Sequence, residues 1–483
     1  MSSASRPSLL MNRLQLNAIA ALCVVSWSTC VDAQTNNAQT APLVLTLEEA
    51  LQYALDHYPT IRVALERVNA STANVSVAQA AHLPRLDAFW QTNRATANNV
   101  FGQLLPQSVI PALSGPVLSS ASNDSVWGSA VGALASWEPF DFGLRGASVR
   151  GAEAAVVLAR ADESLTRLEV QSAVAAAFLA VAQAEQTVAA TQADVERRAI
   201  LAGAARTLAD NQLRPGAEAS RADAERAAAL TRSILARQAL GLAQTTLTRV
   251  LGVTAATVAV NSTSLLATAP AMGGTSGAAS THLLAQAHQA SVDVARAQED
   301  VLAHTNRPRL YLQSSVFARG SGANADGLFD GGGDGLGLER TNWAAGVQVV
   351  FPNVFEFASL RARRASAAAS TRAEIARYDQ ALLTVTSEQR AATVVVDAAR
   401  AVAANTPIQL AAAQQSETQA RARYEAGLAS IVEVADTQSL LAQAEYQDAL
   451  AKVEVWRALL ADAVAHGDLT PFVNVVRSSR GVR

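Results

Sequence analysis

The sequence predicts a mainly α-helical protein with a few membrane-length β-strands, built from one unit that is present twice. The tripeptide Pro-Arg-Leu at 84–86 returns at 308–310, and the pattern Phe-Asp/Glu-Phe at 140–142 returns at 355–357. In each copy, two alternating segments separated by a loop are followed by a very long alanine-rich helical stretch. Repetition in a fixed order indicates duplication of one structural unit.

Composition limits the kind of core that this chain can form. Of its 483 residues 50% are hydrophobic, but only 5% are aromatic, and much of the apolar content is alanine. Alanine-rich helices pack closely along slender seams, so we expect stability to come from long helix seams and from association between chains. The net charge of −3 gives no basic surface for nucleic acid.

The first 33 residues, 1–33, have the layout of a secretory signal peptide. Arg6 and Arg13 precede an apolar run, and a small-residue cleavage site ends at Ala33. Cleavage there would remove Cys23 and Cys30, the two cysteines of the chain. The alternative is a lipid anchor on Cys30. Past this segment no continuous apolar run of about 18 residues is present, so we expect no bilayer-crossing helix.

The first copy is expected over residues 34–265. A capping box from Thr46 to Glu49 predicts the start of an amphipathic helix. The elements expected after this helix are a strand hairpin at 86–137, a long helix at 146–212 and a return helix at 215–251. A small, polar and Gly-rich linker at 266–281 then joins the two copies.

The second copy is expected over residues 282–470, with a C-terminal tail at 471–483. Its elements are an opening helix near 283–304, a strand hairpin at 310–351, a long helix at 358–426 and a return helix at 430–466. Each long helix would span about 100 Å at about 1.5 Å per residue, which exceeds the diameter of a compact domain. The opening and return helices together match that length, so we expect them to stack end to end beside it.

The second strand of each hairpin indicates where the strands would lie. Its alternating face begins and ends with an aromatic ring, Trp127 and Trp137 in the first copy and Trp343 and Phe351 in the second. About ten residues with aromatic ends suit a tilted strand that crosses a bilayer, with its end rings at the two interfaces. The alternative is the edge of a soluble sandwich.

Two further features leave alternatives open. The Gly- and Asp-rich loop 320–341 is either a calcium-binding loop or a mobile surface loop; its spaced aspartates are Asp326, Asp330 and Asp334. Arginines also gather where strand gives way to helix. Because positive charge opposes a helix N-terminus, these side chains either meet lipid headgroups or are solvated. They are Arg145, Arg150, Arg361, Arg363 and Arg364.

Residue types that carry catalysis are present but not arranged for it. The six histidines show no metal-ligand spacing, and no phosphate-binding loop or nucleophile elbow is found. Adjacent carboxylates such as Glu48 and Glu49 do not share a helix face. We therefore expect no enzymatic activity, no metal and no cofactor.

With these elements in place, the sequence resembles the TolC-like outer-membrane efflux protein family, the outer membrane factors. The resemblance covers nearly the whole mature chain and rests on an ordered set of motifs rather than on any one of them. The motifs are Leu47-Glu48-Glu49-Ala50-Leu51, Tyr58-Pro59, Leu83-Pro84-Arg85-Leu86, the segment 137–142 and Leu247-Thr248-Arg249-Val250-Leu251-Gly252. The second copy departs from this pattern, since its opening helix is shorter and lacks the Tyr-Pro element.

The resemblance implies a homotrimer in the outer membrane, in which each chain gives four strands to one twelve-stranded β-barrel. Long antiparallel helical hairpins would form an α-barrel through the periplasm and meet a periplasmic adaptor and an inner-membrane pump. Oligomerisation also follows from the residues alone. Four strands cannot close a barrel when the smallest bilayer barrels need about eight, and an open edge in lipid leaves backbone groups unpaired at several kcal/mol each.

The resemblance also assigns roles to the helical tips. Adaptor contacts would fall on the residues of the two turns, which are Leu213, Gly216, Gly427, Leu428 and Ser430. Glu433 and Asp436, just past the second turn, would form an acidic periplasmic gate. The alternative for these residues is that they are ordinary turn and helix-surface positions.

The function predicted from these observations is a passive exit duct of a tripartite efflux or type I secretion system, for small molecules or polypeptide. One rival interpretation is a secreted, soluble Ala-rich coiled-coil scaffold. The other is a periplasmic binding module or enzyme. No residue identifies the transported substrate, the pump or the adaptor.

Overall fold

The computed structural model describes residues 43–96, 124–253, 258–262, 277–322, 333–352 and 355–481, all within the compact unit Pro42–Arg483. Predictions for the signal peptide at 1–33, for Cys30, and for Asp326 and Asp330 concern residues outside these ranges. Asp334, the third aspartate of that loop, begins a short 3₁₀ helix, η2 (Asp334–Leu336).

Among the described residues, the first half of the chain contains one short strand, two short helices, two long strands and two long helices. In chain order they are β1 (Leu43–Leu45), α1 (Leu47–His57), α2 (Pro59–Ala80), β2 (Arg85–Thr96), β3 (Ser125–Phe140), α3 (Leu144–Asp210) and α4 (Gly216–Leu251). The second half repeats the order. It contains β4 (Val258–Val260), η1 (Ala279–Thr281), α6 (Leu283–His304), β5 (Arg309–Ser321), β6 (Arg340–Val350), α7 (Phe357–Glu425), α8 (Ile431–Ala465) and α9 (Thr470–Gly481).

Local sequence accounts for where these helices begin and end. The Thr46–Glu49 capping box starts α1, with both reciprocal hydrogen bonds formed. Pro59 occupies the first turn of α2, where its missing N–H costs nothing. The long helices have 67 residues in α3 and 69 in α7, and α7 continues through Pro407.

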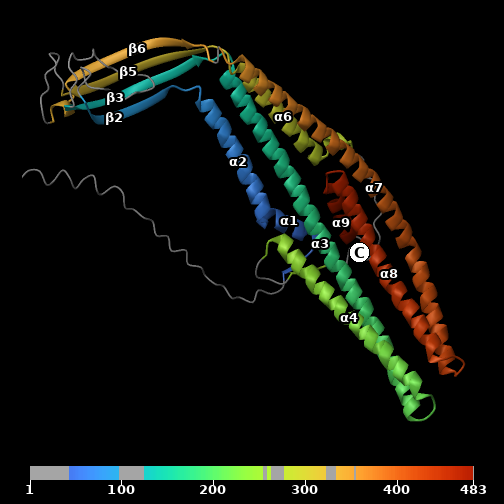
Figure 1. Ribbon diagram of the computed structural model, residues 1–483. Helices are drawn as coiled ribbons and strands as arrows, with labels where there is room; N and C mark the ends of the chain where they lie inside the picture. The colour runs from blue at the N-terminus through green and yellow to red at the C-terminus, as the bar shows by residue number, and fades with distance from the viewer. Residues whose placement is uncertain are drawn as a thin grey trace, which may run out of the picture. The chain divides into compact units, whose positions relative to one another are not determined.

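The helices pack side by side in a fixed order (Figure 1). Helix α3 contacts α2 and α4 on one side and α6 and α8 on the other, and α7 packs against α6 and α8. Each long helix is therefore accompanied by two shorter helices, α2 and α4 along α3, and α6 and α8 along α7. Strands β2, β3, β5 and β6 lie at one end of α3 and α7, and the two turns lie at the other.

Strands β2, β3, β5 and β6 form one antiparallel sheet in that order. Strand β3 runs past Trp137, where the hairpin was expected to end, and reaches Phe140 through a bulge opposite β5. A second, two-stranded parallel sheet joins β1 to β4, inside a region that the sequence presented as irregular.

The main core lies where the short helices meet the middle of the long ones. Its largest fully buried side chains include Phe178, Leu247, Trp456 and Phe472, and the rings of Trp456 and Phe472 meet edge-on at 6.1 Å. Most of the predicted C-terminal tail at 471–483 belongs to helix α9, which buries Phe472 and Val476 in this core.

One stretch of α3 is apolar enough, by length and composition alone, to cross a membrane. The sequence was expected to contain no continuous apolar run of about 18 residues and no bilayer-crossing helix. Half of this stretch is buried against other elements. That burial is typical of a core helix, and it matches the position of α3 between its neighbours.

Candidate functional site

The four-stranded sheet has two chemically different faces. Residues directly opposite each other in antiparallel strands share a face, and the register places Leu86 opposite Ala135, Val131 opposite Ala318 and Val316 opposite Trp343. We call this the outer face. Apart from Arg94 near one end, its large exposed side chains are apolar and include Leu86, Trp90, Val131, Trp137, Leu312, Val316, Trp343, Val347 and Val349.

The opposite, inner face is mainly polar. Its side chains include Asp87, Gln91, Asn93, Gln313, Ser315, Arg319 and Gln348. A small apolar cluster interrupts it, where Phe89 and Phe317 flank Gly132. A sheet with apolar residues on one face and polar residues on the other is the pattern of a transmembrane barrel wall.

The sheet is open along β2 and β6, which are its edge strands. Each edge carries a row of backbone donors and acceptors with no partner strand among the described residues. In a hydrocarbon environment each such group costs several kcal/mol. The apolar outer face and the open edges together require a further strand on each side.

Aromatic side chains mark both ends of the outer face. Near one end Arg94 lies over Trp127 with its guanidinium carbon 5.5 Å from the ring centre. Near the other end the Trp137 indole donates a hydrogen bond of 2.9 Å to the carbonyl of His82. Exposed rings of Phe140 and Phe351 follow on the same side. Rings in these positions suit the two interfaces of a bilayer.

The connection from β3 to α3 is held by a buried ion pair. Arg145 donates through Nε to Asp141 at 2.9 Å and through Nη1 to the carbonyl of Ala81 at 3.0 Å. The Asp141 carboxylate also accepts from the backbone N–H groups of Gly143 and Arg145. Burial alone would raise the pKa of Asp141, but these hydrogen bonds and the Arg145 charge hold it below its usual value.

The other junction arginines differ from one another. Arg150 pairs with Asp300 at 2.5 Å, and Arg364 reaches Asn306 Oδ1 at 2.9 Å at the C-terminal end of α6. Arg361 and Arg363 are exposed. Neither predicted alternative, lipid contact or solvation, applies to Arg145, because its side chain is buried. Both alternatives stay open for Arg361 and Arg363.

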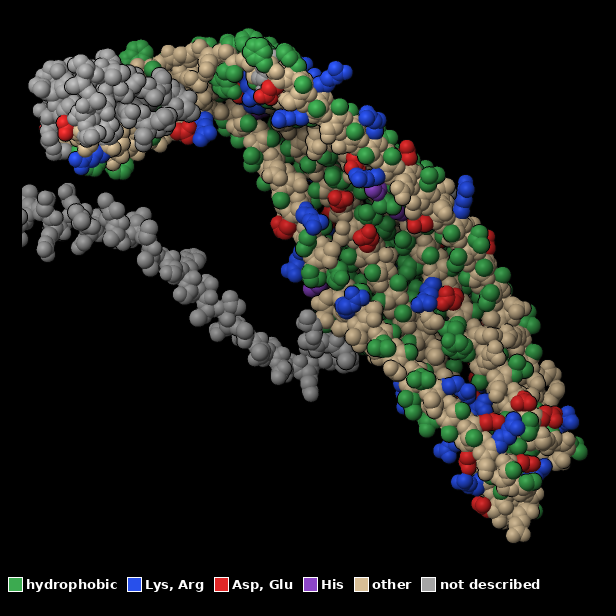
Figure 2. Space-filling view, viewed as in Figure 1, with side chains coloured by type: hydrophobic (Ala, Val, Ile, Leu, Met, Phe, Trp, Pro, Cys, Tyr) green, Lys and Arg blue, Asp and Glu red, His purple; other side chains and the backbone are tan. Residues whose placement is uncertain are grey.

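The two helical turns lie together at the end of the helices away from the sheet, where charged side chains are prominent (Figures 1 and 2). Leu213 and Leu428 are 69% and 73% exposed, so both present apolar surface to solvent. Gly216 begins α4, Gly427 ends α7 in the left-handed region at φ +75°, and Ser430 precedes α8. All five predicted tip residues thus belong to one end of the helices.

Side chains between the turns join the first hairpin to the second. Ala202, Ala205 and Ala222 from α3 and α4 pack with Tyr424 and Val434 from α7 and α8. The Arg214 guanidinium lies 5.3 Å from the ring centre of Tyr424. Burial, and then the nearby charge of Glu218, raise the pKa of the Tyr424 hydroxyl, while Arg214 opposes this.

The two predicted gate carboxylates have different surroundings. Glu433 forms an ion pair of 3.0 Å with Arg423, across the turn between α7 and α8. Asp436, one turn further along α8, is exposed. The structure therefore leaves the Asp436 carboxylate exposed to solvent, whereas Glu433 is paired with Arg423 of its own chain.

Sequence reasoning missed an ion network that lies above the turns. Arg198 is 4% exposed and contacts Asp194 at 2.9 Å, Glu225 at 2.9 Å and Ser439 at 3.0 Å, so that it joins α3, α4 and α8. Arg232 adds a second contact to Asp194 at 2.9 Å. The i, i+4 spacing of Asp194 and Arg198 was the available signal, but it is also the spacing of an ordinary surface pair.

The fold and the two-faced sheet define an outer-membrane channel protein with long helical hairpins. Comparison with known families gives the same answer: the model of the outer membrane efflux protein family matches residues 50–253 and 278–461. The chain belongs to this family, and the two matched segments are its two copies. It is an efflux channel of the outer membrane with its helices in the periplasm, and the soluble-scaffold interpretation is not supported.

Solved structures share the fold. The outer membrane protein VceC of Vibrio cholerae is 18% identical, with 87% of this chain and 96% of that chain covered and a TM-score of 0.70. The CmeC channel of Campylobacter jejuni is 15% identical, with 90% of each chain covered and a TM-score of 0.70. The open-state MtrE channel of Neisseria gonorrhoeae is 18% identical over 87% and 89%, with a TM-score of 0.66. No functionally curated protein matches the sequence.

Proposed function

We propose that three copies of this chain close one twelve-stranded barrel and one helical tunnel, which together form a passive exit duct. The observation that carries the proposal is the open four-stranded sheet, with an apolar outer face and two free edges. Pairing β2 of one copy with β6 of the next would satisfy both edges. Three sheets of four strands then exceed the roughly eight strands that a closed barrel needs.

The helices offer matching free sides for the same assembly. Among the described residues, helix α7 packs mainly against α6 and α8, and it exposes Leu383, Val394 and Ile408 along one face. At the opposite end of the packing order, α4 exposes Leu230 and Ile234. Exposed apolar stripes of this kind mark association surfaces. Each copy's α7 would lie beside the α2 and α4 helices of its neighbour.

The experiment is oxidative cross-linking between edge strands in a Cys23→Ser, Cys30→Ser background. Thr92→Cys on β2 is combined in turn with Trp343→Cys, Ala345→Cys and Val347→Cys on β6, which share its face. We expect one pairing to yield covalent trimers. Val131→Cys on the central strand β3 is the control. It should yield no covalent trimers, because β3 is paired on both sides within its own chain. Monomers from every pairing would contradict the proposal.

We further propose that the tips contact a periplasmic adaptor and an inner-membrane pump, which supply the energy. The exposed Leu213 and Leu428, next to turns that are open around Gly216 and Gly427, support this. Leu213→Asp with Leu428→Asp should abolish efflux in cells while leaving the trimer and its membrane insertion unchanged. Unaltered efflux would reject the tips as the contact.

The two copies proposed here are 34–265 and 282–470, joined by the linker 266–281.

Asp436 is our proposed gate residue, with Glu433 in a supporting position. Asp436→Asn should raise the low conductance of the closed channel to anions in a planar bilayer, because a ring of carboxylates repels anions. Glu433→Gln should release Arg423 and change conductance less. Equal conductance of the wild type and both variants would leave these residues as ordinary helix surface.

A further inference from the structure

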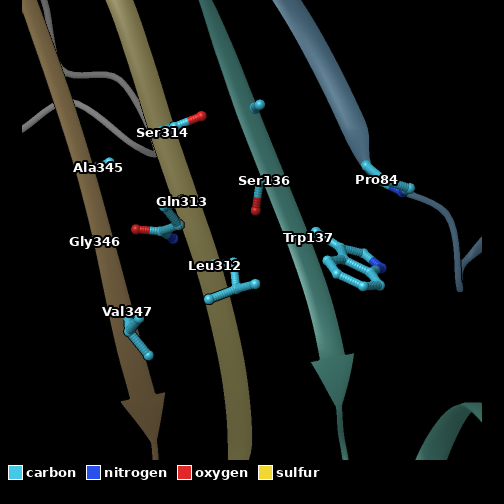
Figure 3. A pocket seen from close by; sticks show the side chains of 10 residues that line it. Pro84, Ser136, Trp137, Leu312, Gln313, Ser314, Ala345, Gly346 and Val347 are labelled. Atoms are coloured by element: carbon cyan, nitrogen blue, oxygen red, sulfur yellow. The ribbon is translucent and has the colours of Figure 1, made fainter.

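A furrow crosses the outer face near its periplasmic end. It has a volume of about 530 Å³ and is lined by residues of β3, β5 and β6 together with Pro84 (Figure 3). Its floor is the row Ala135, Ser314 and Ala345, which lie directly opposite one another. No large side chain rises from this row, so the surface is hollow between its neighbours.

Large side chains form the walls of the furrow. Trp137, Leu312 and Val347 make the next row toward the helices, again directly opposite one another. Val316 and Trp343 are exposed and lie in the row beyond the floor, outside the residues that line the furrow. The furrow therefore runs across the strands beside the ridge of Trp137, Leu312 and Val347, with mainly apolar groups on its surface.

The Trp137 ring is fixed as a wall. Its indole N–H donates to the carbonyl of His82 at 2.9 Å, which holds the ring beside β3 next to the segment that carries Pro84 (Figure 3). The ring could otherwise turn over Ala135 and fill the space. Atoms that line an empty space lose dispersion contacts with the atoms that would fill it. A ligand that fits the furrow would therefore be stabilised by new dispersion contacts with its lining.

We propose that the furrow binds one acyl chain of a phospholipid from the leaflet of the outer membrane nearer the periplasm. The lining is mainly apolar, with Ser314 as the polar residue of the floor, which favours a hydrocarbon ligand, and the furrow continues the lipid-facing surface. It lies within the rows nearest the strand-to-helix connections, which places it at the depth of that leaflet. The proposal depends on the outer face being in lipid, but not on the tip or gate assignments.

The test uses the full-length protein in vesicles of phosphatidylethanolamine and phosphatidylglycerol. A small fraction of the phosphatidylethanolamine carries a diazirine on one acyl chain, and cross-links are mapped by mass spectrometry. We expect labelling around residues 134–138 and 312–316 to exceed labelling around Trp90 and Val131 by about tenfold, since packing rather than hydrophobicity selects partners in lipid. Even labelling over the outer face would show annular lipid only and would overturn the proposal.

Filling the furrow gives a second test. Ala135→Leu with Ala345→Leu should remove the excess labelling, whereas Ala133→Leu with Ala318→Leu, on the same face outside the furrow, should keep it. Heat-resistant trimers and single-channel conductance are measured in parallel. Loss of labelling with normal conductance supports the acyl-chain site. Loss of the trimer in the filled variant alone would overturn the proposal and assign the furrow to a neighbouring copy. Finding only acyl groups that are covalently attached to Cys30 would also overturn it, because the bound chain would then not come from a phospholipid.

Discussion

The two copies connect strand to long helix by different means. In the first, Arg145 and Asp141 form a buried pair that also holds the carbonyl of Ala81 at the end of α2. In the second, Glu356 stands at the position of Asp141 and is exposed, and Arg364 reaches the end of α6 from the side. Both arginines thus contact the C-terminal end of an opening helix, where cations are favourable.

The position in the sheet of the strand that precedes each junction explains the contrast. Strand β3 has neighbours on both sides, so the junction that follows it is enclosed within the chain. Strand β6 and helix α7 are at the edge, where Phe355 is 92% exposed. Duplication supplied the same sequence pattern twice, but only the junction after the central strand β3 can complete its packing within one chain. The junction after the edge strand β6 has room for a neighbouring subunit.

The largest expected effect is at the buried pair. Arg145→Ala leaves Asp141 buried without its partner, which costs about 3–5 kcal/mol. Arg364→Ala, the matched change in the second copy, removes exposed contacts and should cost about 1 kcal/mol or less. Thermal unfolding in detergent, followed by circular dichroism, measures both. Equal losses would mean that the two junctions are equally enclosed in the assembled protein.

The second effect is at equivalent glycines in the second strand of each hairpin. A Cβ on Gly132 would lie 2.5 Å from Phe317 Cβ and 2.6 Å from the carbonyl oxygen of Val316, whereas a Cβ on Gly346 would meet nothing within 4 Å. Gly132→Ala should therefore cost about 1–3 kcal/mol through overpacking, and Gly346→Ala should be close to neutral. The yield of heat-resistant oligomer on a gel reports both changes. A large loss at Gly346 would reveal a neighbouring copy in contact there.

The sequence allowed the long helices and strand hairpins to be predicted because their periodicity extends over many residues. It did not reveal α9, since a helix of 12 residues gains its stability from burying Phe472 and Val476 against elements far away in the chain. Pro139 hid the end of β3, because proline normally ends a strand and is tolerated here at a bulge.

The tip residues were predicted from their place in the repeat, but their contacts were not. Arg214 belongs to the turn of the first helical hairpin and contacts Tyr424 of the second hairpin, which is far away in the sequence. Periodicity within a segment carries no information about such long-range pairs. The outer and inner faces of the sheet could be anticipated from alternation within each strand. The furrow could not, because it depends on the register between three strands.

The third effect concerns the turns that end the long helices. Gly427 ends α7 at φ +75°, while the same position after α3 holds Gln212 at φ +58°. A side chain in this left-handed region costs about 1 kcal/mol, and glycine avoids the cost. Gln212→Gly should therefore stabilise the protein and Gly427→Ala should destabilise it, each by about 1 kcal/mol. Opposite shifts of the unfolding midpoint would confirm this, and shifts of the same sign would contradict it.

The smallest effect is a pH dependence in the first copy. Glu185 on α3 is partly buried, and burial raises its pKa above the usual 4.5, although the Ser262 hydroxyl donates to its carboxylate at 3.3 Å and opposes the rise. The folded protein therefore holds this proton more tightly than the unfolded chain does. Stability grows as the pH falls through the raised pKa toward 4.5 and gains nothing more from this group below that value.

Glu185→Gln removes this dependence by supplying an uncharged side chain at every pH. We expect the variant to unfold at a higher temperature than the wild type at pH 7, by a margin that shrinks as the pH approaches 4.5. Glu388→Gln, at an exposed carboxylate on the long helix of the second copy, is the matched control and should unfold like the wild type throughout. A margin for Glu185→Gln that stays constant with pH would show that its carboxylate is solvated in the assembled channel. The contrast between the two strand-to-helix junctions would then not extend to the middle of the long helices.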